Sequence, residues 1–177
     1  MSPGPEGGGT LVSVTPDPEK ARAGMSAEQM RENVLQLAFG GDAARLESFC
    51  ERIRRVLPAD AAAVVRGSSV TGERWEDGAP FDAEGPGTSD IDLTLVGKDV
   101  LEWYDPHEGF YIAAIHTKPL SDEHPHVAPT LRPLRDELSS MAGRPVNIQG
   151  TRDWIMFVRE YLMGQPYLVL VGKLEAA

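Results

Sequence analysis

Asp90 and Asp92 lie in the segment SDIDLTLVG, separated by one apolar residue. Residues two apart on a β-strand point to the same face, which places the two Cα atoms about 6 to 7 Å apart. On a half-buried surface, two such carboxylates repel each other and resist the loss of water. A divalent cation makes the pair favourable, and Mg²⁺ is commonly held by one or two carboxylates together with substrate phosphates. The alternatives are two aspartates on a solvated strand face, or two aspartates paired with basic residues beneath them.

A Gly-Ser step precedes the aspartates, in the segment VVRGSS. Gly67 allows the backbone to approach a ligand, and Ser68, Ser69 and the amides that follow can hold phosphate oxygens. Transfer from a nucleoside triphosphate requires such a loop together with metal-binding carboxylates, because the metal neutralises developing charge while the loop fixes the leaving group. We therefore predict Mg²⁺ as the cofactor and a nucleoside triphosphate, with ATP the expected one, as the substrate.

The pattern GSS…SDIDLTLV resembles the signature of the DNA polymerase beta-type nucleotidyltransferase superfamily, in which Gly-Ser ends one strand and Asp-x-Asp lies on the next. Within that superfamily, RGSSVTG, G-x-PFD, SDIDL and the later GRPVNI are similar to the nucleotidyltransferase-like effector domains of bacterial polymorphic toxins. The resemblance implies an α/β (α+β) fold, with a small mixed sheet flanked by helices. It also implies Mg²⁺ held by Asp90 and Asp92, and transfer of a nucleotide to a hydroxyl group of a protein, an RNA such as tRNA, or a small molecule.

One position departs from the superfamily pattern. Its third carboxylate lies on a following strand, for which RPVNIQ is the candidate, and the matching residue is Asn147. An amide oxygen can ligate a cation, but it brings no negative charge and cannot act as a general base. We expect Asn147 to face the two aspartates and to share their binding site. Either two carboxylates suffice, or Glu137 or Glu160 substitutes for the third, or the chain is a non-catalytic nucleotide-binding or antitoxin-like module.

Composition limits the remaining classes. The chain has 177 residues, enough for one ordinary domain, and its formal net charge of −10 slightly disfavours an RNA acceptor. The single Cys50 cannot form an internal disulfide, and we expect it to lie in the core. No apolar run reaches the roughly 18 residues of a membrane span, and no signal peptide is recognisable at the start of the sequence. A cytoplasmic protein without a membrane partner is the expectation.

The chain divides into a predicted disordered tail over residues 1–24, rich in Gly and Pro, and a nucleotidyltransferase-like domain over residues 25–177. Ser26 and Asp42 are predicted to cap two helices, the second with the apolar stripe Leu46, Phe49, Cys50, Ile53 and Leu57. A third helix is expected from about Leu131, and a fourth is expected to be capped by Thr151. The predicted strands are AAAVVRG, SDIDLTLVG, PVNIQG and PYLVLVG.

Three further features have a structural and a functional interpretation. The segment HTKPLSDEHPHVAP, with His116, His124 and His126, is interpreted as a mobile loop, and zinc binding through H-x-H is the alternative. Arg52 and Arg55 share one helical face, which is typical of a solvated surface or of a contact to a polyanionic acceptor. Trp75, in the polar excursion over residues 73–88, is either a packing residue or a contact to a nucleobase or acceptor.

Overall fold

The computed structural model describes residues 24–174 and contains one mixed six-stranded sheet, which confirms the predicted α+β class. The strand order is β3-β4-β5-β2-β1-β6, with β2 and β5 parallel and the other neighbours antiparallel. The strands are β1 (Ala62–Arg66), β2 (Ile91–Val96), β3 (Phe110–Ile112), β4 (His116–Thr117), β5 (Val146–Thr151) and β6 (Tyr167–Val171). All four predicted strands are therefore present, and β3 and β4 are additional.

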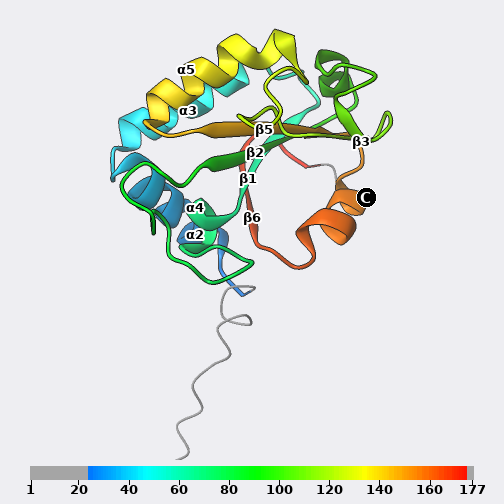
Figure 1. Ribbon diagram of the computed structural model, residues 1–177. Helices are drawn as coiled ribbons and strands as arrows, with labels where there is room; N and C mark the ends of the chain where they lie inside the picture. The colour runs from blue at the N-terminus through cyan, green and yellow to red at the C-terminus, as the bar shows by residue number, and fades with distance from the viewer. Residues whose placement is uncertain (1–23, 175–177) are drawn as a thin grey trace, which may run out of the picture.

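The longer helices lie on one face of this sheet. In Figure 1, α3 (Ala43–Arg54) and α5 (Arg132–Ala142) lie side by side above it. Their buried side chains pack against alternate residues of the central strands, as the period of two along a strand requires. This core includes Leu46, Phe49, Cys50 and Ile53 of α3, Leu134 and Leu138 of α5, and Ile91, Leu93, Leu95 and Ile148 of the sheet. The predicted stripe of α3, Cys50 included, is buried apart from Leu57, which is partly buried against it.

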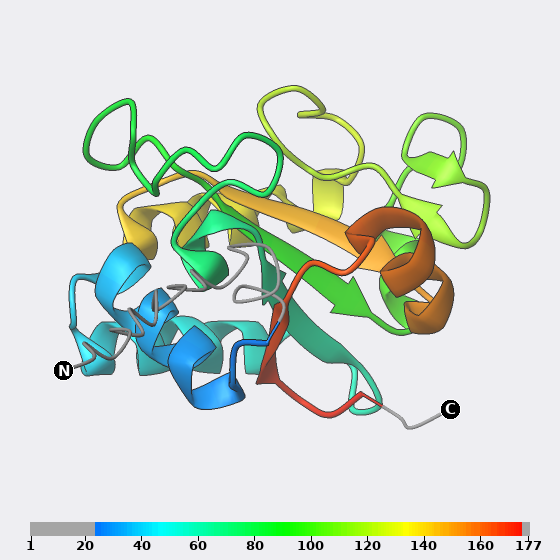
Figure 2. The ribbon, with the colours of Figure 1, turned by 90° about the horizontal axis from the view of Figure 1, so that it is seen from below.

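A shorter helical segment covers part of the opposite face. It consists of α6 (Trp154–Phe157) and the π-helical turn η4 (Val158–Leu162). Figure 2 shows this orange segment in front of the sheet and α5, in yellow, behind it. Asp153 caps α6 by accepting a hydrogen bond from the Met156 amide, so the prediction of Thr151 as the cap is wrong. Thr151 instead completes β5, because the strand continues further than its apolar pattern indicates.

The N-terminal part of the domain follows the sequence closely. Ser26 caps α2 (Ala27–Asn33) with a capping box to Gln29, and α2 continues into the π-helical turn η1 (Val34–Ala38). Asp42 caps α3 by accepting from the Arg45 amide. The tail predicted for residues 1–24 lies, apart from Gly24, outside the described residues. No helix of the described part has the length and apolar character needed to cross a membrane.

The segment predicted as a mobile loop is ordered at its start, so that prediction is wrong for His116. His116 lies in β4, is fully buried, and pairs with Thr151 of β5. Strands of two or three residues carry too little alternation to be recognised from sequence. The remaining elements are α4 (Ser68–Thr71) and the 3-10 turns η2 (Asp99–Trp103) and η3 (Pro129–Leu131).

Candidate functional site

The parallel pairing of β2 with β5 brings the two aspartates together with the amide expected beside them. Asp92 is the Cα partner of Asn147, and Asp90 directly precedes β2. Asn147 donates from Nδ2 to Asp90 Oδ2 at 2.7 Å and to Asp92 Oδ1 at 3.2 Å. The predicted position of Asn147 is therefore confirmed, whereas its role toward a cation remains a prediction. The amide bridges the two carboxylates and offsets part of their repulsion.

Gly67 lies against the Asp92 carboxylate, on the β1 side of β2. It follows β1, whose last residue is the Cα partner of Asp92, and it has φ +87°, which L side chains rarely adopt. A Cβ at Gly67 would lie only 3.1 Å from Asp92 Oδ2. Glycine is thus required here both by the backbone conformation and by the close approach to Asp92. Ser68 then begins α4, a single helical turn.

One polar cavity of about 290 Å³ joins these parts. This volume is near the lower end of the roughly 300–1,000 Å³ typical of small-ligand pockets. The cavity is lined by Arg66, Gly67, Ser68, Arg74, Trp75, Glu76, Glu84, Thr88, Ser89, Asp90, Asp92 and Gln165. Ser69, predicted to hold phosphate, is fully buried and is not among the lining residues. Trp75 does line the cavity, as its functional interpretation requires.

The electrostatics of Asp92 are unfavourable for a carboxylate. Loss of water on burial raises the pKa of Asp92 above its usual value, and the nearby charges of Asp90 and Glu76 raise it further. Arg66 and the hydrogen bond from Asn147 act in the opposite direction. Within the described residues Arg66 forms no ion pair with Asp92, so the interpretation of the aspartates as a directly salt-bridged structural pair is not what the structure shows. A divalent cation would supply the missing positive charge.

The side chains around Asp92 provide oxygen ligands of the kind that Mg²⁺ prefers. Carboxylate oxygens of Asp90 and Asp92 are hard ligands that face one another across the Asn147 amide. Asn147 presents its NH₂ group to them, so it would ligate a cation only after a turn of the amide that brings Oδ1 to the same place. Within residues 24–174 no group of three or more His, Cys, Asp and Glu side chains is arranged to hold a metal ion. The residues therefore fit a cation that takes two carboxylates and one amide oxygen from the protein and its remaining ligands from water or substrate.

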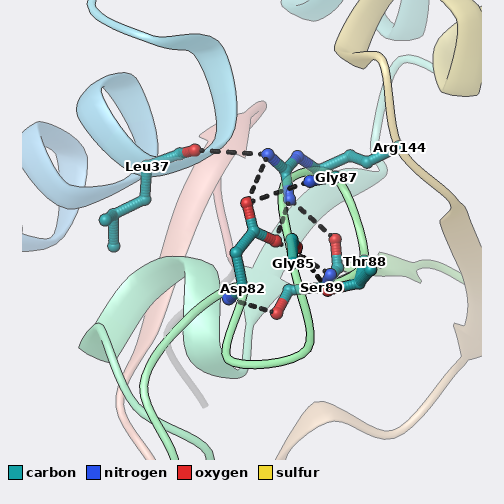
Figure 3. A network of polar contacts seen from close by, with 7 residues as sticks. All are labelled: Leu37, Asp82, Gly85, Gly87, Thr88, Ser89 and Arg144. Atoms are coloured by element: carbon teal, nitrogen blue, oxygen red, sulfur yellow. Dashed lines mark hydrogen bonds and ion pairs between the residues drawn. The ribbon is translucent and has the colours of Figure 1, made fainter.

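A network at the edge of the cavity, which Ser89 also lines, fixes the entry to β2 (Figure 3). Arg144 donates to Asp82 Oδ1 at 2.8 Å and to Oδ2 at 3.2 Å, and it also donates to the Ser89 carbonyl at 2.9 Å. Asp82 accepts from the backbone amides of Gly87 and Ser89, which closes the loop directly before Asp90. The hydrogen bonds from Arg144, followed by those two amides, lower the pKa of Asp82 to about 2. The sequence fragments G-x-PFD and GRPVNI thus meet in one ion pair that no local pattern indicates.

Neither of the acids predicted as substitutes for the third carboxylate lines the cavity. Glu137 accepts a hydrogen bond from Arg52 at 2.6 Å, on the opposite face of the sheet. This pair also shows that Arg52 is bound to the neighbouring helix. Glu160 lies in η4 and is not among the lining residues. Glu76 and Glu84, in the acidic excursion, do line the cavity. In the sequence, only their position between Ser68 and Asp90 indicates that they lie near the site.

The histidines of residues 24–174 belong to no group of side chains arranged to hold a metal ion. His116 Nδ1 lies 2.6 Å from Thr151 Oγ1, and burial lowers the pKa of His116. The Thr151 hydroxyl also lies 3.2 Å from the Asp153 carbonyl oxygen, so Thr151 links His116 to the turn that precedes α6. His124 contacts the ring of Tyr111 edge to face. His116 is accordingly a buried core residue next to Phe157 and Tyr161.

Comparison of the chain with protein-family models, with curated proteins and with solved structures found no match.

Proposed function

We propose that this protein is a Mg²⁺-dependent nucleotidyltransferase that transfers a nucleotide from a nucleoside triphosphate, ATP being the expected one, to a hydroxyl group. The acceptor is a protein, an RNA such as tRNA, or a small molecule. One observation carries the proposal: Gly67 and Ser68, from the end of β1 and the start of α4, line the same cavity as Asp90 and Asp92 of the β2 segment. Phosphate-binding amides and metal-binding carboxylates then act on one substrate.

In this reaction the acceptor oxygen forms a bond to the α-phosphorus, and the bond from that phosphorus to the bridging oxygen of the β-phosphate breaks. Pyrophosphate leaves with the electron pair, and the proton of the acceptor hydroxyl passes to a carboxylate of the cavity wall, where Glu76 and Glu84 lie besides the two aspartates. Mg²⁺, when bound, neutralises charge on the phosphate oxygens. Gly67 and Ser68 hold the departing phosphates, while Asp90 and Asp92 place the cation and the α-phosphate relative to each other. Trp75 lies on the cavity wall, where an aromatic ring can contact a nucleobase.

The resemblance of GSS…SDIDLTLV to the polymerase beta-type superfamily supports the same reaction. The similarity of RGSSVTG, G-x-PFD and GRPVNI to effector domains of polymorphic toxins supports a toxin-type role. Asp82 and Arg144, which come from two of those fragments, form an ion pair beside the site. The fragments are therefore explained as parts of one structure that positions the loop before Asp90.

A second candidate function is non-catalytic nucleotide binding, as in a sensor or an antitoxin-like module. Asn147 favours it, because the amide occupies the position of the superfamily's third carboxylate and donates to both aspartates. Asn147 cannot accept the proton of an acceptor hydroxyl. Catalysis would then need a proton acceptor from elsewhere, and Glu76 and Glu84 are the acids of the cavity wall besides the two aspartates.

Labelled transfer separates the two candidates. The full chain is incubated with Mg²⁺, each of the four α-³²P nucleoside triphosphates and a cell lysate, and labelled protein, RNA and small molecules are then separated. We expect one class to become labelled, together with release of pyrophosphate, and Asp92→Asn to abolish both. Nucleotide binding without label or pyrophosphate would support the non-catalytic module. The absence of any nucleotide binding would contradict both candidates.

A further inference from the structure

Arg66 is the cationic residue that directly precedes the Gly-Ser step, and nothing in the resemblance assigns it a role. It ends β1, is the Cα partner of Asp92, and lines the cavity with Gly67 and Ser68. Because side chains of paired residues in neighbouring strands share a face, Arg66 and Asp92 lie on the same side of the sheet. The guanidinium is thus close to the place where the backbone amides of Gly67 and Ser68 would hold an anion.

The Arg66 side chain is held in place from two sides. Arg66 Nη2 donates to Gln149 Oε1 at 3.3 Å, and Gln149 is itself fixed by a bond from Nε2 to the Thr117 carbonyl at 2.7 Å. The Arg66 Cζ atom lies 5.9 Å from the centroid of the Phe157 ring. Phe157 is fully buried and stacks on Trp154 and Tyr161, so the ring beside the guanidinium is held by its neighbours. The cation is therefore oriented before any ligand arrives.

Its charge is not matched by a carboxylate in contact. Arg66 forms no ion pair with any acid of residues 24–174, and its buried Nε has no hydrogen-bond partner there. The other arginine of the cavity wall, Arg74, is different: it binds Asp77 at 3.2 Å and Glu84 at 2.9 Å. Asp92 interacts with Arg66 electrostatically, but that carboxylate is already bound by Asn147. The half-buried guanidinium therefore carries a positive charge that no contacting carboxylate neutralises, and an anion bound in the cavity would neutralise it.

We propose that Arg66 binds the β- and γ-phosphates of the nucleotide and stabilises them as they leave together as pyrophosphate. This inference rests on the proposed function for the identity of the anion. A guanidinium suits this task because its planar array of N–H donors can bind two phosphate oxygens at once. Gly67 and Ser68 can donate hydrogen bonds to the phosphates but bring no charge, so Arg66 is the residue that neutralises the phosphate charge. Asp90 and Asp92 would hold the cation. The cavity then has carboxylates for the cation and a guanidinium for the phosphate chain of one Mg²⁺-polyphosphate.

Isothermal titration of the full-length protein with inorganic tripolyphosphate and Mg²⁺ tests this assignment without an acceptor or a base. We expect the parent to bind, Arg66→Gln to bind at least about tenfold more weakly, and Arg66→Lys to bind with an intermediate affinity, because it retains the charge and loses the planar donors. Arg54→Gln is the control, since it removes an exposed arginine of α3 that is paired with Glu47 and Glu51 and does not line the cavity. We expect its affinity to stay within about threefold of the parent.

Thermal unfolding of each variant is measured alongside. If Arg66→Gln does not fold, Arg66→Lys decides: a folded lysine variant that binds tripolyphosphate as tightly as the parent overturns the proposal. A parent that binds no tripolyphosphate, or an Arg66→Gln variant that binds it normally, also overturns it. Loss of binding in Arg66→Gln without any labelled transfer by the parent would support this inference and contradict the proposed enzyme activity. Labelled transfer by the parent that is unchanged in Arg66→Gln would support the proposed enzyme activity and contradict this inference.

Discussion

Arg144 and Asp82 form a two-point ion pair, with Nη1 2.8 Å from Oδ1 and Nη2 3.2 Å from Oδ2, although they are 62 positions apart in the chain. The Arg144 side chain is only 8% exposed, and its guanidinium lies 4.5 Å from the centroid of the Phe81 ring. The pair ties the loop before Asp90 to the residue that precedes the Pro145-Val146 entry to β5. It therefore sets the relative position of the two strands that carry Asp90, Asp92 and Asn147.

Arg144→Met tests this positioning. The variant leaves the Asp82 carboxylate without its cation, and breaking a largely buried pair in this way costs about 3 to 5 kcal/mol. We expect a loss of unfolding free energy near the lower end of that range, because Asp82 is partly exposed and keeps two backbone amides. Urea unfolding measures it. Arg54→Met, which removes an exposed arginine of α3, is the control and should cost less than about 1 kcal/mol. Equal effects of the two substitutions would contradict a special role for Arg144.

The same pair predicts a pH dependence. The pKa of Asp82 is about 2 in the folded protein, below its ordinary value of 3.8, so the folded state favours the ionised form. The stabilising contribution is therefore fully present above about pH 4 and is lost as the pH falls toward 2. Asp82→Asn lacks this contribution, so its deficit in unfolding free energy relative to the parent should shrink over that interval. Asp136→Asn, at an exposed position of α5, serves as the control. A deficit that stays constant from pH 5 to pH 2 would show that the pair is not the cause.

Asp92→Asn distinguishes a metal site from a structural pair. Without a cation, the substitution removes repulsion from Asp90 and a carboxylate whose burial is unfavourable. We expect the thermal stability of the metal-free protein to be unchanged or slightly raised, and Mg²⁺-dependent ATP binding to be lost. If Asp92 instead served as the counter-charge that Arg66 needs for folding, the variant would lose about 3 to 5 kcal/mol. A strongly destabilised variant, or one that binds Mg-ATP like the parent, would contradict the proposed site.

Asn147→Asp restores a carboxylate at the superfamily's third position. It replaces the hydrogen-bond donor that bridges Asp90 and Asp92 with a third negative charge. The metal-free protein should become less stable, by about 1 to 3 kcal/mol for the lost bridge, while the affinity for Mg²⁺ rises. Unfolding with and without Mg²⁺ measures both effects. Asn147→Ala, which removes the bridge without adding charge, should lose stability and gain no Mg²⁺ affinity.

Gly67→Ala tests the close approach of the backbone to Asp92. Gly67 lies at φ +87° and ψ −161°, a region that is almost restricted to glycine, so alanine there costs about 1 to 3 kcal/mol, and its Cβ would lie 3.1 Å from Asp92 Oδ2. Gly72 serves as a control for positive φ, since it lies in the left-handed region at φ +83° and ψ −10° and has no heavy atom within 4 Å of the added Cβ. We expect Gly67→Ala to lose more stability than Gly72→Ala, and only Gly67→Ala to weaken Mg²⁺-dependent nucleotide binding. An equal loss of binding in both would assign the effect to backbone strain alone.

The sequence alone determined the features that depend on near neighbours in the chain. The period of two in SDIDLTLV places Asp90 and Asp92 on one face, and the caps Ser26 and Asp42 start α2 and α3 through bonds three residues away. The burial of Cys50 follows from its place in the helical stripe of α3. Asn147 was identified through the resemblance, as the residue of RPVNIQ that matches the superfamily's third carboxylate.

Only the tertiary structure decided which distant residues meet. The ion pair of Asp82 with Arg144, the entry of Glu76 and Glu84 into the cavity, and the unmatched charge of Arg66 depend on how the excursion and the C-terminal helix fold back onto the sheet. The burial of His116 has the same origin, since a strand of two residues is stabilised by its pairing with β5 and by Phe157 and not by its own sequence. Local propensity acts over about four residues, whereas these contacts join segments dozens of residues apart. Such contacts stabilise the protein only after the chain between them has formed a closed loop, so a local sequence pattern does not reveal them.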